Sequence, residues 1–117
     1  CNLDVINTFL SLKLKTKAAV TTLATVYTVP SSTTAIVLGL MVGNTTGSAV
    51  TSTVTVDSNT ADTETNAAVE LLTTTQIPGY SSLEVMAGNK IVLQTTDMLK
   101  VYGSGAVDVA LSIMEIT

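Results

Sequence analysis

Apolar and polar residues alternate along much of this chain, which is the pattern of β-strands that bury one face. Valines occupy positions 50, 54 and 56, and residues 107–113 are apolar at every odd position, so that Asp108 and Ser112 face the other way. Residues 35–42 form a continuous apolar run, which suits a strand buried on both faces. Weaker patterns predict further strands within 21–29, 67–75, 83–86, 90–94 and 98–102.

These segments amount to about eight or nine strands separated by short turns, which predicts an all-β fold, an antiparallel β-sandwich of Greek-key or jelly-roll type. Residues 61–72 would tolerate a helix, but we expect a loop followed by a strand there. No apolar run approaches the roughly 18 residues that span a bilayer.

The N-terminal region alternates most regularly. Leu10, Leu12 and Leu14 fall on one face of a predicted strand, and Ser11, Lys13 and Lys15 fall on the other. We expect the leucine face to be the buried one. The lysines, together with Lys17, form either a solvated strand face or a docking patch for an acidic protein surface, which makes Lys13, Lys15 and Lys17 candidate subunit contacts.

Two prolines mark predicted crossings between sheets. The segments "YTVPSSTTAIVLGL" and "TQIPGYSSLEVMAG" both place Pro after an apolar residue, then a pair of hydroxyl residues, then a strand. Because Pro30 and Pro78 lack a backbone N–H, each ends a ladder, and the hydroxyl groups then bond to the crossing backbone. Asp97 is the third structural candidate, since a turn aspartate accepts hydrogen bonds from nearby N–H groups.

Composition points to one domain with a surface that is poor in charge. The 117 residues are 46% hydrophobic and only 12% charged, with 22 threonines and 15 valines by count. Such a surface is easier to understand if other copies or partners cover it. We expect residues 1–17 to form an N-terminal arm and first strand that contact neighbouring subunits, and residues 18–117 to form the sandwich.

The residue inventory argues against most chemistry. The net charge is −4 with no histidine or arginine, which disfavours nucleic-acid binding and removes imidazole-based catalysis and metal ligation. We therefore expect no enzyme, no cofactor, no nucleic acid and no membrane. Carboxylates near one loop (Asp57, Asp62, Glu64, Glu70) or near turns and on outward strand positions (Asp97, Asp108, Glu115) do not form an obvious pair. Residues 57–62 resemble a calcium loop only in part, so a solvated loop is the expectation.

Four aromatic residues and one cysteine complete the inventory. Without tryptophan, and with only Phe9, Tyr27, Tyr80 and Tyr102, a strong lectin is not expected. Cys1 is the only cysteine among the 117 residues, so no disulfide can form within them. A chain cannot start translation at cysteine, so we expect residues before it, and either an ordinary fragment or a lipidated lipoprotein terminus fits.

Residues 26–117 carry a resemblance. The pieces are the strand Lys90–Leu93, the turn at Asp97, Leu99–Val101, the final Ser112–Ile116 and the "IPGYSSL" turn at 77–83, preceded by residues 26–56. Together they resemble small β-sandwich virion proteins of tailed bacteriophages. One departure is Thr96, where that group usually has glycine before the turn aspartate.

The resemblance implies a virion protein, most simply a capsid decoration (cement) protein that binds the major capsid protein or other virion proteins, as a homo-oligomer and most simply a trimer. A tail, neck or fibre-base component is an alternative within the virion. A secreted or lipid-anchored domain that binds glycans or another cell is an alternative of a different class.

Overall fold

The computed structural model describes residues 10–58, 67–86 and 90–117, and these form nine strands. In chain order they are β1 (Leu10–Val20), β2 (Ala24–Thr28), β3 (Thr34–Asn44), β4 (Val50–Asp57), β5 (Val69–Ile77), β6 (Ser82–Glu84), β7 (Ile91–Leu93), β8 (Met98–Gly103) and β9 (Val107–Ile116). The described ranges contain no helix, so the predicted all-β class is confirmed.

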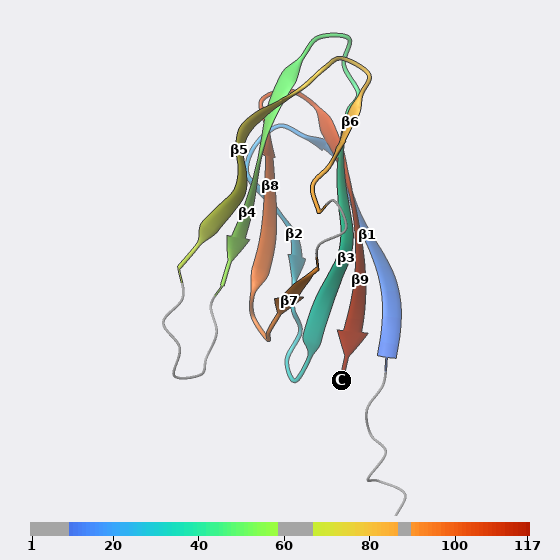
Figure 1. Cartoon of the computed structure of the whole chain (residues 1–117), viewed down its shortest axis with the longest axis vertical. Coiled ribbons are helices and arrows are strands. Elements are labelled where there is room, and N and C mark those ends of the chain that lie inside the picture. Colours follow the sequence, from blue (N-terminus) through green and yellow to red (C-terminus); the bar gives the residue numbers. More distant parts are fainter. Residues whose placement is uncertain (1–9, 59–66, 87–89) are drawn as a thin grey trace, which may run out of the picture.

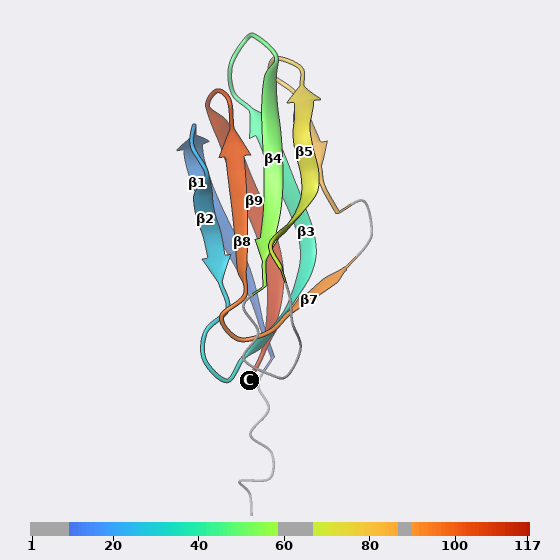
Figure 2. The same ribbon diagram turned by 90° about the vertical axis from the view of Figure 1, so that its left-hand side faces the viewer.

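The strands form two antiparallel sheets that pack face to face (Figures 1 and 2). Sheet A has the order β1-β9-β3-β6, with β7 also paired to β3, and sheet B has the order β2-β8-β4-β5. Each strand of sheet A is linked along the chain to sheet B, and the pairs β1·β9, β2·β8, β3·β6 and β4·β5 wind one long ribbon around the core. This connectivity is a jelly roll, the narrower of the two predicted topologies.

The core follows directly from the alternation in the sequence. Every odd position of β9 from Val107 to Glu115 is buried, and every even position of β4 from Val50 to Val56 is buried, because successive side chains of a strand point to opposite faces. The largest fully buried side chains include Leu40, Leu111 and Ile113 from sheet A and Leu99 from sheet B.

Both prolines stand where the chain crosses between sheets, as predicted. Pro30 follows β2 and Pro78 follows β5, which are the two edge strands of sheet B, and the next strand in each case belongs to sheet A. A missing N–H is tolerated there because the chain is leaving the ladder.

The turn between β7 and β8 has a backbone conformation at Thr96 that would suit glycine better. Thr96 has a φ of 73°, in the left-handed region that a β-branched residue rarely adopts. Glycine would adopt this conformation without strain, so the turn keeps a shape that suits glycine although a threonine occupies the position.

The prediction for the N-terminal strand is wrong in one respect. β1 forms as expected, but its leucines are the exposed face: Leu10 is 65%, Leu12 73% and Leu14 64% exposed. The sequence pattern separated the two faces correctly, but the leucine face is the outer one, and Ser11, Lys13 and Lys17 on the opposite face are exposed as well.

Some of the residues singled out from the sequence lie outside the described ranges. They are Cys1, Asp62, Glu64 and most of the candidate calcium loop at residues 57–62. The expected boundary after residue 17 falls within β1, which continues to Val20 as part of sheet A.

Candidate interaction surface

The orientation of β1 is fixed by its pairing with β9. Ser11 lies opposite Glu115, Lys13 opposite Ile113, and Lys15 opposite Leu111. Since directly opposite residues of an antiparallel pair share a face, the lysines project from the inner face of sheet A. The leucines therefore project outward.

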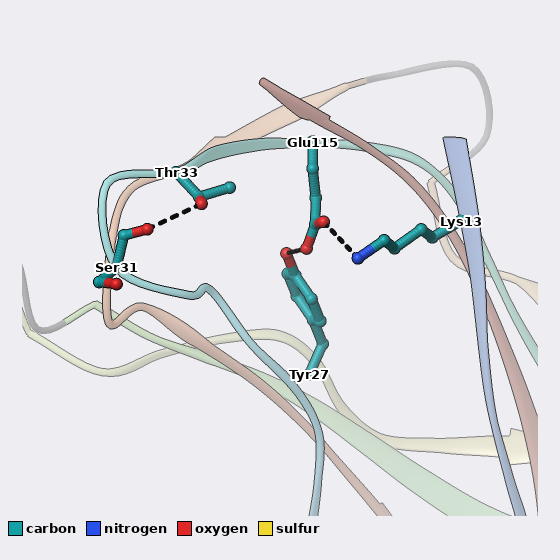
Figure 3. Close-up of polar contacts among 5 residues, drawn as sticks. All are labelled: Lys13, Tyr27, Ser31, Thr33 and Glu115. Atoms are coloured by element: carbon teal, nitrogen blue, oxygen red, sulfur yellow. Dashed lines mark hydrogen bonds and ion pairs between the residues drawn. The ribbon is translucent and has the colours of Figure 1, made fainter. Parts of the chain in front are cut away.

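A carboxylate inside the sandwich accounts for this orientation (Figure 3). Glu115, in β9, is 4% exposed, and its carboxylate accepts a hydrogen bond from the Tyr27 hydroxyl of β2. Lys13 Nζ lies 2.7 Å from Glu115 Oε1. The three side chains connect β1, β9 and the facing sheet, so the buried charge is paired and hydrogen-bonded at once.

The environment shifts the pKa of both acids in this group. Hydrogen bonds from Lys13 and then from Tyr27 lower the pKa of Glu115 below its usual value, although burial opposes the shift. Burial, followed by the hydrogen bond to Glu115 and its charge, raises the pKa of the Tyr27 hydroxyl well above its usual value. The carboxylate is therefore held charged and the phenol neutral.

Sequence reasoning missed this group, since it placed Glu115 near a turn or on an outward strand position. Glu115 is 4% exposed, and that expectation is wrong. For Glu115 the signal was present: position 115 continues the odd, inward series of residues 107–113.

The outer face of sheet A carries a continuous apolar surface. In the register of the sheet, Leu12 lies opposite Met114, Met114 opposite Ile36, and Ile36 opposite Val92, which forms one row across four strands. Leu12 and Val92 at the two ends are 73% and 61% exposed. Leu10 and Leu14 flank Leu12 along β1, and Met41 lies further along β3. We call the three leucines along β1, Leu10, Leu12 and Leu14, the leucine row.

The remaining lysine candidates lie on the same strand as Lys13. Lys15 is half-buried and lies close enough to Glu115 for its charge to help lower that pKa, whereas Lys17 is exposed. An open hollow of about 420 Å³ lies beside this end of β1 and is lined by Lys17, Met41 and Asp108 among others. Asp108 Oδ1 accepts the Ala19 N–H at 2.9 Å, which fixes the end of β1.

The structural turn candidates form backbone contacts. Asp97 Oδ2 accepts the Gln94 N–H at 2.9 Å, and Asp97 Oδ1 accepts the Ser58 hydroxyl at 3.2 Å. The Asp97 carbonyl accepts the Val29 N–H at 3.0 Å, so this turn is tied to the chain just before Pro30. The Pro78 carbonyl accepts the Ser81 N–H at 3.2 Å.

Asn44 is a structural residue that the sequence did not single out. Its buried amide donates to the carbonyls of Ser48, Ile77 and Pro78, and its Oδ1 accepts the Thr46 N–H. It therefore joins the loop after β3 to the crossing after β5.

The described residues offer little for catalysis or metal binding. Among them no group of three or more Asp, Glu, Cys or His side chains is placed to hold a metal ion. Asp57 is paired with Lys100 at 3.1 Å, and the Glu70 carboxylate accepts the Thr73 hydroxyl at 2.6 Å. The described ranges contain no helix that is long and apolar enough to cross a membrane.

No protein-family model and no curated protein sequence matches this chain. A solved structure of Bacillus endospore appendages, described as a novel family of disulfide-linked pili, is similar with a TM-score of 0.52 and 14% sequence identity. The match covers 93% of this chain and 86% of that one. At this identity it shows a shared sandwich fold.

Proposed function

We propose that this chain is a non-enzymatic structural subunit that works by adhesion to copies of itself or to other proteins of an extracellular assembly. The observation that carries the proposal is the apolar outer face of sheet A. Four strands at about 4.8 Å spacing and five residues at about 3.4 Å rise span roughly 300 Å². Most outward positions in this area are apolar, with Ser112 and Thr34 as polar exceptions. The largest apolar patch on a typical monomer is of about this size and is often functional.

The charge distribution supports the same role. All three lysines of β1 project away from the leucine row, and Glu115 neutralises Lys13. The residues of the row from Leu12 to Val92 are uncharged, whereas Glu84 and Asp108 lie further along the same face. An uncharged row favours an apolar partner, because no charge has to be stripped of water when the two surfaces meet there. The scarcity of charge in the whole chain fits a molecule whose surface is extensively covered.

The sequence resemblance favours one form of this assembly, a phage virion in which the protein decorates the capsid, bound to the major capsid protein, most simply as a homotrimer. A jelly roll is a common fold for virion proteins, although a fold alone does not assign a function. Decoration requires many copies on each particle, and multivalency then makes individually weak contacts tight.

The similar solved structure favours a second form, an appendage fibre. That neighbour is a disulfide-linked pilus, whereas the 117 residues of this chain contain one cysteine. A continuous disulfide-linked polymer requires at least two cysteines per subunit. A fibre formed by these 117 residues alone would therefore depend on non-covalent contacts such as the outer face of sheet A.

Copy number and morphology separate these forms. Purified phage particles should contain the chain at high copy number by quantitative mass spectrometry if it decorates heads, and at low copy number if it belongs to a tail, neck or fibre base. Negative-stain electron microscopy of the purified protein should show filaments only in the appendage form. A chain that stays monomeric, joins no particle and binds cells or glycans saturably would contradict the proposal and favour the adhesion domain.

A further inference from the structure

The free edge of β1 offers a place for another strand. β1 is the last strand of sheet A and, among the described residues, it pairs only with β9. Its register is regular from Leu10 to Lys17, without proline or bulge. Proteins commonly protect such an edge with a charge on it, and here the lysines of the inner face are the only candidates.

Those lysines do not oppose pairing in every register. Directly opposite residues of an antiparallel pair share a face. If residue i of one strand lies opposite residue j of the other, leucines can therefore meet leucines only when i + j is even. In a pair of identical strands related by a twofold axis, each such register is centred on one residue. The registers worth comparing are those centred on residues 11 to 14.

Repulsion between lysines and the number of residues paired distinguish these registers. Centring on Lys13 places Lys13 against its own copy, and centring on Leu14 places Lys13 against Lys15 of the second copy, twice. Like charges directly opposite are destabilising. Centring on Ser11 pairs only residues 10–12 of the described strand.

Centring on Leu12 avoids each of these problems. Leu12 meets its own copy, Leu10 meets Leu14 of the second copy, and Lys13 meets Ser11 of the second copy. Lys13 is already neutralised by Glu115 of its own chain at 2.7 Å. All three leucines of each copy therefore have an apolar partner, and no lysine faces a lysine within the five pairs.

From this self-complementarity we infer that β1 pairs antiparallel with β1 of a second copy of this chain, about a twofold axis at Leu12. The two A sheets then become one continuous sheet, and the two leucine rows become a single apolar stripe on its outer face. This inference rests on the proposed function, which it deepens by naming the occupant of the edge and the register. A separate threefold contact elsewhere on the surface is compatible with it.

Cysteine cross-linking tests the register. In the full chain with Cys1→Ser, the introduced thiol is the only one, and Leu12→Cys should form a symmetric disulfide under mild oxidation. In the matched variant Leu14→Cys, the two copies of residue 14 lie about 14 Å apart along the strands. That exceeds the roughly 7 Å limit for a disulfide, so we expect at least about ten-fold slower cross-linking. Mixing Leu10→Cys with a tagged Leu14→Cys chain should restore it.

The outcomes separate the inference from the proposed function. Cross-linking of Leu12→Cys no faster than Leu14→Cys, or fastest cross-linking by Lys13→Cys, overturns the inferred register. If that happens while the unmodified chain still self-associates or enters particles, the proposed function stands. A chain that neither self-associates nor enters particles removes both. Circular dichroism of each variant confirms that a failure to cross-link does not come from unfolding, since all three leucines are exposed in the single subunit.

Discussion

Replacing Leu12 by threonine should weaken assembly without weakening the subunit. Leu12 is 73% exposed, and complete burial of a leucine contributes about 1.5–3 kcal/mol. If assembly covers the whole exposed part, each copy loses at most about 1–2 kcal/mol, and a twofold contact that contains the residue twice loses about 2–4 kcal/mol. At 1.4 kcal/mol for each tenfold change, the dissociation constant should rise by at most roughly 30- to 700-fold.

The folding of the subunit should respond differently. Threonine is a good strand former, and substitutions of exposed side chains usually change the free energy of unfolding by about 0.5 kcal/mol or less. Chemical denaturation should therefore give nearly equal free energies of unfolding for wild type and Leu12→Thr when both are measured at a concentration where they are dissociated.

Leu23→Thr provides the matched control. Leu23 is 54% exposed and lies in the connection between β1 and β2, outside the leucine row. Sedimentation equilibrium over a concentration series measures the dissociation constants of wild type and both variants. Equal effects of the two substitutions, or no effect of Leu12→Thr on a wild type that self-associates, would refute the assignment of the outer face as the contact surface.

Three further predictions concern the subunit itself. The lowered pKa of Glu115 means that its contribution to stability is complete above its usual pKa and is lost as the pH falls through the lower, folded-state pKa. The difference in unfolding free energy between wild type and Glu115→Gln should therefore shrink from about pH 7 to about pH 3. A difference that stays constant over this range would contradict the pairing. Thr96→Gly should relieve the left-handed strain and stabilise the fold by up to about 1 kcal/mol in thermal denaturation, whereas a loss would show that the threonine side chain outweighs the strain. Gly79→Ala should destabilise, because its Cβ would lie 2.5 Å from the Gly47 carbonyl oxygen, while Gly39→Ala, with nothing within 4 Å, should avoid such a clash; comparable losses in both would contradict this account.

Much of the fold could be predicted because strand periodicity is a local signal. The valines of β4 and the odd positions of β9 alternate with polar residues over seven positions or more, and the structure buries these positions. The crossings at Pro30 and Pro78 could also be predicted from the local sequence, since a residue without an N–H fits best where a ladder ends. The order in which the strands pair could not be predicted, because it depends on strands that lie far apart in the chain.

The candidate surface shows where local reasoning fails. Alternation separates the two faces of β1 but does not say which one meets the interior, and hydrophobicity alone chose the leucines. The decisive partner of Lys13 is Glu115, 102 positions later, together with Tyr27 from the other sheet. A buried carboxylate that attracts a lysine inward is a long-range electrostatic effect, and no window along the chain reveals it.

The place of β9 in sheet A has a consequence for how the protein folds. β9 lies between β1 and β3, so Leu10 is paired with Ile116, 106 positions later. The strand that joins β1 to the rest of sheet A is therefore made well after β1 itself, and topologies dominated by such distant pairings fold slowly. Until β9 is available, β1 lacks its pairing partner in sheet A, and unpaired strand edges make folding intermediates prone to aggregation.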